Sequence, residues 1–200
     1  MTKVPKGNTY HHGDARATLI RAAEELLSEV GAAALSLRGV AERAGLSRQA
    51  PYNHFVDKEA LLAAVAVIGF EELEAAVRTE TVGLVGEVAL VASAEAYIAT
   101  AQRSPHLFRL MFSRELVDVK KFEDTALASK RAYAAMVEVI STFCPAAQVS
   151  DLSLVAWCIV HGYACLCNEA GIEGPELRRA RAQLFASVIK SSVVAGQNIN

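Results

Sequence analysis

Residues 45–62, GLSRQAPYNHFVDKEALL, constrain the fold of this chain more than any other stretch. They contain a turn at Gly45, a short helix, a second helix cap at Asp57 and the start of a long apolar helix. The preceding residues 36–44, SLRGVAERA, predict a first short helix that Ser36 can cap. Two short helices joined by a glycine turn predict a helix-turn-helix, whose second helix can lie in the major groove of DNA.

The outward side chains of the second helix suit the edges of bases. Arg48, Gln49 and Asn53 are polar residues in a segment whose neighbours can pack inward. Arginine pairs with guanine O6 and N7, and glutamine or asparagine pairs with adenine N6 and N7. We therefore expect these three residues to read sequence in the major groove.

Residues around the second helix suit phosphate contacts. Tyr52 and His54 can donate hydrogen bonds, and Lys58 adds positive charge to the first turn of the following helix. Helix N-termini and lysines both attract phosphate groups. The complete predicted set of DNA-contacting residues is Ser36, Arg38, Ser47, Arg48, Gln49, Ala50, Tyr52, Asn53, His54 and Lys58.

Pro51 disturbs the second helix. If Ser47 is the N-cap, a proline at position 51 removes the first helical hydrogen bond and disfavours helical angles at Ala50. We expect residues 48–50 to form a loose or 3₁₀-like turn and the regular helix to begin at Pro51. Leu46 and Ala50 can pack inward, while Ala50 or Pro51 can also reach the outward side.

The remaining sequence predicts an all-α protein, because it is rich in alanine and leucine and has only short β-branched runs. Asp14 is expected to cap the first helix, and Gly31 to end it. The later helices are expected at residues 57–80, 87–103, 105–112, 120–143, 150–169 and 175–195. The predicted domains are a flexible arm (1–13), a helix-turn-helix head (14–56), and a ligand-binding and dimerisation domain (57–200) that begins with a long connecting helix.

Charge and cysteine content narrow the class of protein. The net charge of −2 means that DNA binding requires basic residues to gather locally, as they do near the N-terminus. Cys144, Cys158, Cys165 and Cys167 show no disulfide spacing, and no signal peptide is apparent, which indicates reduced thiols in the cytoplasm. The charge-free residues 152–168 indicate a buried helix rather than a membrane span. No metal or cofactor is expected.

The helix-turn-helix segment resembles the N-terminal domain of the TetR family of bacterial repressors. The matching features are Gly31, the stretch SLRGVAERAGLS, and then Tyr52, His54, Phe55, Lys58, Glu59 and Leu62. YHHGDAR (residues 10–16), Ala50-Pro51-Tyr52 and the Trp157/His161-Gly162 pairing resemble the subgroup named for a Trp-His-Gly C-terminal domain. The resemblance implies a homodimeric, all-helical repressor that binds a palindromic operator and releases it when a small-molecule effector binds.

The regulatory half is predicted to supply a subunit interface and a pocket. The helix at 150–169 is apolar on nearly all sides, so it must be covered by its own domain and by a partner subunit. The residues assigned to that interface are Trp157, His161, Leu184 and Val188. Large apolar and aromatic residues can line an effector pocket. The residues assigned to it are Tyr97, Phe108, Met111, Phe112, Tyr133 and Met136.

Two alternative functions remain open on the sequence. His161 and Cys165 share a helix face at positions i and i+4, which allows a thiol-sensing regulator on the same DNA head. A small enzyme could instead use His161 with Cys158 or Cys165. No phosphate loop or nucleophile elbow accompanies these residues, so we expect the protein not to be an enzyme.

Overall fold

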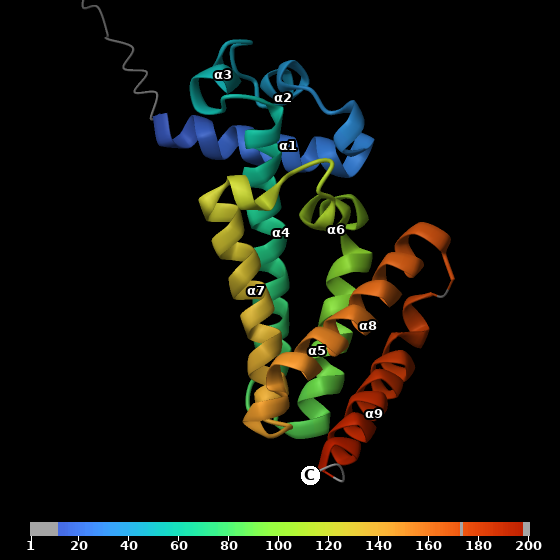
Figure 1. Ribbon diagram of the computed structural model, residues 1–200. Helices are drawn as coiled ribbons and strands as arrows, with labels where there is room; N and C mark the ends of the chain where they lie inside the picture. The colour runs from blue at the N-terminus through green and yellow to red at the C-terminus, as the bar shows by residue number, and fades with distance from the viewer. Residues whose placement is uncertain (1–11, 173, 198–200) are drawn as a thin grey trace, which may run out of the picture.

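The computed structural model describes residues 12–172 and 174–197, and within these ranges every regular element is a helix (Figure 1). The prediction of an all-α fold is confirmed. Residues 1–11 of the predicted N-terminal arm (1–13) lie outside the described residues. The helices are α1 (His12–Ala34), α2 (Leu37–Arg43), α3 (Ala50–His54), α4 (Lys58–Thr81), α5 (Gly86–Arg103), α6 (Pro105–Phe112), α7 (Glu123–Ser141), α8 (Val149–Ala170) and α9 (Arg178–Gln197), with short 3₁₀ turns η1 (Val119–Lys121), η2 (Ala146–Gln148) and η3 (Pro175–Leu177).

Helix α1 starts earlier than predicted, and Gly31, its predicted end, is a break within it. It begins at His12, so Asp14 lies inside the first turn rather than at the N-cap, and the predicted start is wrong by three residues. Gly31 breaks the helical path with φ 72° and ψ 168°, a conformation that other residues rarely adopt. Leu19, Ala23 and Leu27 are buried on the inner side of the helix. This face holds α1 against α4 and α6.

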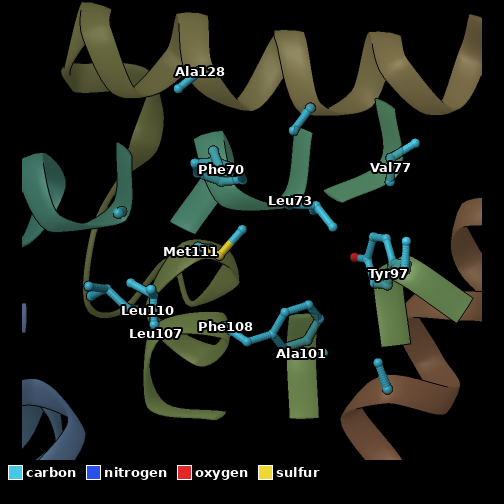
Figure 2. Close-up of a cluster of buried hydrophobic side chains, with 14 of the residues drawn as sticks. Phe70, Leu73, Val77, Tyr97, Ala101, Leu107, Phe108, Leu110, Met111 and Ala128 are labelled. Atoms are coloured by element: carbon cyan, nitrogen blue, oxygen red, sulfur yellow. The ribbon is translucent and has the colours of Figure 1, made fainter. Parts of the chain in front are cut away.

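Helix α4 connects the N-terminal helices to the rest of the molecule (Figure 1). Asp57 caps it as predicted: its Oδ1 accepts a hydrogen bond from the Ala60 amide at 2.7 Å. The helix is buried on several sides because α5, α6 and α7 all pack against it. Phe70, Leu73 and Val77 extend from it into the core that Figure 2 shows. A shift of α4 would therefore move the N-terminal helices relative to this core.

Gly69 allows α6 to approach α4 closely. A Cβ at this position would lie 2.5 Å from the sulfur of Met111 and 3.0 Å from Leu107 Cγ. Both side chains are buried on α6 (Figure 2). Because there is no room for a methyl group, the contact between these two helices depends on a glycine here.

The second half follows the predicted boundaries with two differences. Helix α6 has the predicted bounds, with Pro105 in its first turn. The helix predicted at 120–143 is divided into η1 and α7, because Phe122 adopts an extended conformation. The helix predicted at 175–195 likewise begins as the 3₁₀ turn η3 before α9. Both differences lie at helix ends, where local hydrogen bonds compete with the regular pattern.

Candidate nucleic-acid interface

Helix α2 and the turn that follows have the geometry of a helix-turn-helix. Ser36 caps α2 as predicted, because its Oγ accepts a hydrogen bond from the Gly39 amide at 3.1 Å. Val40 and Ala41 are buried and fix α2 on the core of the head. Gly45 has φ 66°, so the predicted positive-φ turn is confirmed. The chain then reverses toward α3 at the end of the molecule (Figure 1).

The start of α3 differs from the prediction. Ser47 does not cap the helix with its side chain; instead, the Ala50 amide donates to the Ser47 carbonyl at 2.9 Å. This i-to-i+3 bond is the predicted 3₁₀-like turn, but the helix begins at Ala50, one residue before Pro51. A proline in the first turn costs no helical hydrogen bond, since the first amides have no partner within the helix.

Polar and aromatic side chains are exposed on α3 and on the two residues before it. Arg48, Gln49, Tyr52 and Asn53 are all exposed. Pro51 is buried, so the alternative of an outward Pro51 is wrong. These four residues lie in α3 or just before it, and α3 is at the end of the molecule formed by α1–α3 (Figure 1). Their donors are therefore free to meet base edges or phosphates.

The other predicted contact residues flank this surface. Ser36, Arg38 and Ser47 are exposed, whereas Ala50 and His54 are half-buried. Neither Arg38 nor Arg48 forms an ion pair with any residue of the described ranges, so both guanidinium groups are available to an anion. A surface of this kind favours a polyanionic ligand.

Lys58 has a structural contact that the sequence did not indicate. Its ammonium donates to the carbonyl oxygen of Ala33 at 3.2 Å and so ties the start of α4 to the end of α1. An ammonium has three donors, so this contact leaves two for a phosphate. Arg43 takes no part in the surface, because it forms ion pairs with Glu29 at 2.6 Å and Glu25 at 3.4 Å. These contacts hold α1, α2 and α4 in one unit.

The predicted pocket residues are divided among several places. Tyr97 and Met136 line a tight apolar cavity of about 40 Å³ between α5, α7, α8 and α9. Phe108 and Phe112 line a larger cleft, of about 590 Å³, between α6 and α8. Met111 packs on Gly69 instead. Tyr133 packs on the ring of Trp157, with centroids 5.4 Å apart. Of the two hollows, only the α6–α8 cleft has the volume usual for small-molecule sites.

The α6–α8 cleft includes residues that sequence reasoning did not assign to a pocket. These are Pro105, His106, Arg109, Ser113, Cys165, Asn168 and Glu169, together with His161. The strongly amphipathic pattern of residues 105–112 could have indicated the cleft, because the polar side of such a helix faces away from the core. The partners on α8 could not be found without knowing how the two helices pack.

Two of the four residues assigned to the subunit interface face their own core. Trp157 Nε1 donates to the Tyr97 hydroxyl at 3.2 Å, and His161 Nδ1 lies 2.9 Å from the same oxygen. Leu184 and Val188 on α9 are exposed, as an interface requires. The exposed apolar side of α8 consists instead of Leu154, Val155 and Leu166. A subunit interface that includes α8 would therefore use this opposite face.

Helix α8 and its preceding turn, Ala146–Ala170, are long and apolar enough to cross a membrane by length and composition alone. The inner face of α8 nevertheless packs against α5, α7 and α9. The expected burial therefore holds for one face only, because Leu154, Val155 and Leu166 on the other face are exposed.

Comparison with known families decides the class of the protein. The family described as "Bacterial regulatory proteins, tetR family" matches residues 19–65, and that described as "Tetracyclin repressor-like, C-terminal domain" matches residues 90–191. The chain belongs to the TetR family. The predicted family is thus confirmed, while membership of the Trp-His-Gly subgroup stays a prediction. The first match includes α2, α3 and the capped start of α4, the elements that form the surface described above.

Individual relatives agree with this assignment. The TetR-family chain is 53% identical over 49 residues to the tetracycline repressor protein class A from transposon 1721 of Escherichia coli, a match that spans 24% of this chain and 23% of that repressor. A protein of unknown function from Rhodococcus sp. RHA1 has a similar structure, with TM-score 0.74 and 28% identity over 90% of this chain and 97% of that one. The TetR family transcriptional regulator PfmR from Thermus thermophilus shares the fold, with TM-score 0.64 and 19% identity over 84% and 97% of the two chains.

Two of the four thiols are less reactive than a free cysteine. Burial raises the pKa of Cys144, and burial together with the nearby Glu169 carboxylate raises the pKa of Cys165. A raised pKa leaves less thiolate, which is the reactive form. Within the residues that the structure describes, no cluster of three or more His, Cys, Asp or Glu side chains is placed to hold a metal ion.

Proposed function

We propose that this TetR-family regulator is a cytoplasmic, homodimeric repressor that binds a palindromic operator through α3 and releases it when a small molecule binds the regulatory half. The observation that carries the proposal is the exposure of Arg48 and Gln49 just before α3 and of Tyr52 and Asn53 on α3, at the α1–α3 end of the molecule (Figure 1). In this proposal residues 14–56 form the DNA-binding head and residues 57–200 the regulatory domain. The protein acts as a regulator and not as an enzyme.

The dimer would form through the exposed apolar faces of α8 and α9. Leu154, Val155 and Leu166 on α8 and Leu184 and Val188 on α9 leave a large apolar surface open to water. Such a surface marks an interaction site. Two copies related by a two-fold axis would bury it as a four-helix arrangement, and would place two α3 helices about 34–36 Å apart, in successive major grooves.

Release of DNA requires an effector that binds one arrangement of the two heads better than the other. Such coupling is typically worth about 1–3 kcal/mol. Helix α6 supports this proposal, because it forms one wall of the α6–α8 cleft and also packs on α1 and α4. A ligand between α6 and α8 would therefore press on the helices that carry α3.

Selection of bound fragments from random DNA at physiological salt tests the proposed function. A recovered palindrome with half-sites about one helical turn apart would support both DNA reading and the dimer. Recovery of no preferred sequence by a protein that sediments as a monomer would contradict the proposal. Sequence preference without a palindrome would retain the DNA reader and refute the dimer.

A further inference from the structure

A chain of hydrogen bonds leads from the core to the α6–α8 cleft. Trp157 Nε1 lies 3.2 Å from the Tyr97 hydroxyl, and that hydroxyl lies 2.9 Å from His161 Nδ1. His161 Nε2 in turn lies 3.5 Å from Cys165 Sγ. Tyr97 is fully buried, so its hydroxyl depends on these neighbours for its hydrogen bonds.

The chain fixes which nitrogen of His161 carries the proton. The indole N–H of Trp157 can only donate, so the Tyr97 oxygen must accept from it. The one hydrogen of the Tyr97 hydroxyl then goes to its other neighbour among the described residues, His161 Nδ1, which must accept it. A neutral imidazole with an accepting Nδ1 carries its hydrogen on Nε2. Burial lowers the pKa of His161 and so favours this neutral form.

The Nε2–H of His161 lacks a strong acceptor. Its neighbour in the described structure is the Cys165 sulfur, and a thiol accepts hydrogen bonds weakly. Burial and Glu169 raise the pKa of Cys165, so the sulfur stays protonated rather than becoming a thiolate acceptor. Both residues line the α6–α8 cleft, so an oxygen atom entering the cleft would be a better partner for this N–H than the thiol.

One part of the cleft wall suits a flat aromatic ligand. The ring centroids of Phe108 and Phe112 lie 5.3 Å and 4.6 Å from that of His161, so three rings border the same space. The cleft volume of about 590 Å³ is large enough for a small aromatic molecule. Aromatic rings in these orientations favour stacked or edge-on contacts with another ring.

We propose that the α6–α8 cleft is the effector site, and that it takes a flat aromatic molecule whose carbonyl or carboxylate oxygen accepts the Nε2–H of His161. This inference rests on the proposed function, in which a small molecule releases the operator. Tyr97 and Trp157 act as positioning residues, because they hold His161 in the donating form without touching the ligand. The effector would act through α6, whose His106 ring lies against Gly31 of α1 and whose Met111 lies against Gly69 of α4.

The test compares three probes of similar size. Ethylbenzene has no acceptor, acetophenone adds a carbonyl oxygen, and benzoate adds a carboxylate. Their binding to the full-length protein is followed by titration, with NMR of ¹⁵N-histidine to report the protonation of each ring nitrogen. The signals of His161 are those that change in Tyr97→Phe. The expected spectrum of the free protein has hydrogen on Nε2, and the oxygen-bearing probes are expected to shift that resonance.

Affinity supplies a second readout. We expect acetophenone or benzoate to bind roughly threefold to tenfold more tightly than ethylbenzene, the ratio that one neutral hydrogen bond gives. His161→Phe should abolish this preference while keeping a flat ring, and Tyr97→Phe, which frees Nδ1, should reduce it. A preference for benzoate would mark an anionic effector and one for acetophenone a neutral effector.

Two outcomes overturn the inference: hydrogen on Nδ1 in the free protein, or equal affinity for the three probes, including no binding of any of them. If His161→Phe does not fold, the spectrum of the unmodified protein and the Tyr97→Phe titration still decide. Operator selection with the unmodified protein separates the two proposals. Specific DNA binding without a preference for oxygen-bearing probes refutes the effector site alone, whereas absence of specific DNA binding refutes the proposed function.

Discussion

Replacing Tyr97 by phenylalanine should destabilise the protein by about 2 kcal/mol. The change keeps the buried ring, whose centroid lies 5.8 Å from that of Phe108, and removes only the hydroxyl. Two hydrogen bonds are lost, to Trp157 and to His161, and each is worth about 1 kcal/mol net. For a chain of this length, that loss corresponds to a fall in Tm of roughly 4–8 °C.

Urea denaturation followed by far-ultraviolet circular dichroism measures this loss at a fixed protein concentration, because a dimer's apparent stability depends on concentration. Tyr133→Phe is the matched control. The Tyr133 ring also packs on Trp157, but its hydroxyl forms no hydrogen bond that the described residues show. The control should therefore change the free energy of unfolding by less than about 0.5 kcal/mol.

Equal effects of the two substitutions would refute the reasoning, because only Tyr97 has two hydrogen-bonding partners. A double-mutant cycle with Trp157→Phe sharpens the test. If the Tyr97 hydroxyl bonds the indole, the combined loss should be smaller than the sum of the single losses by roughly 0.5–1 kcal/mol. Strict additivity would show that the indole N–H is not bonded to Tyr97.

Three further predictions concern DNA binding, assembly and pH. Gln49→Ala should relax the sequence preference at particular base pairs. Lys58→Ala should instead weaken binding to all DNA sequences alike and make the affinity depend less steeply on salt concentration. Binding titrations over a salt series measure both effects, and identical behaviour of the two variants would contradict the assignment of Gln49 to bases and Lys58 to phosphate. Leu184→Glu should raise the dimer dissociation constant by a factor of roughly ten to a hundred. Leu184 is about half exposed in one subunit, so each subunit loses only about half of the roughly 1.5–3 kcal/mol that full burial of a leucine contributes. Sedimentation at several concentrations measures the change, and an unchanged dimer would refute the interface. The contribution of His161 to the free energy of unfolding should be complete above pH 6.5 and should be lost as the pH falls through its lowered pKa, because the histidine of the unfolded chain takes up a proton at higher pH than the folded one. His161→Gln should flatten this part of the pH profile. Identical profiles for the two proteins would contradict this prediction.

Charged substitutions on α8 distinguish an interface through the exposed face with Leu166 from one through the face with Trp157. The position of Trp157 on an apolar helix predicts a place in the subunit interface, but its indole is bonded inside its own chain. A charge at Trp157 is now expected to unfold the core, whereas a charge at Leu166 should yield a folded monomer. Circular dichroism and sedimentation distinguish these two outcomes.

The amino-acid sequence determined the features that depend on neighbours along the chain. The caps at Ser36 and Asp57, the positive-φ turn at Gly45 and the break at Gly31 each involve a side chain or backbone group within a few residues. Such contacts form in almost any tertiary context, so their patterns predict them well. The turn at Gly45 and the cap at Asp57 set the limits of the segment that contains α3. The exposed residues of that segment could therefore be predicted as well.

The tertiary structure alone decided which face of each helix meets which partner. Helix α8 is apolar on nearly all sides, so its periodicity does not distinguish the face toward Tyr97 from the face toward water. The contact of Lys58 with Ala33 joins residues 25 positions apart in the chain, and that of Tyr97 with His161 joins residues 64 apart. Each exists only after the helices have packed. For this reason the helix-turn-helix could be predicted from the sequence, whereas the proposed effector site required the packed structure.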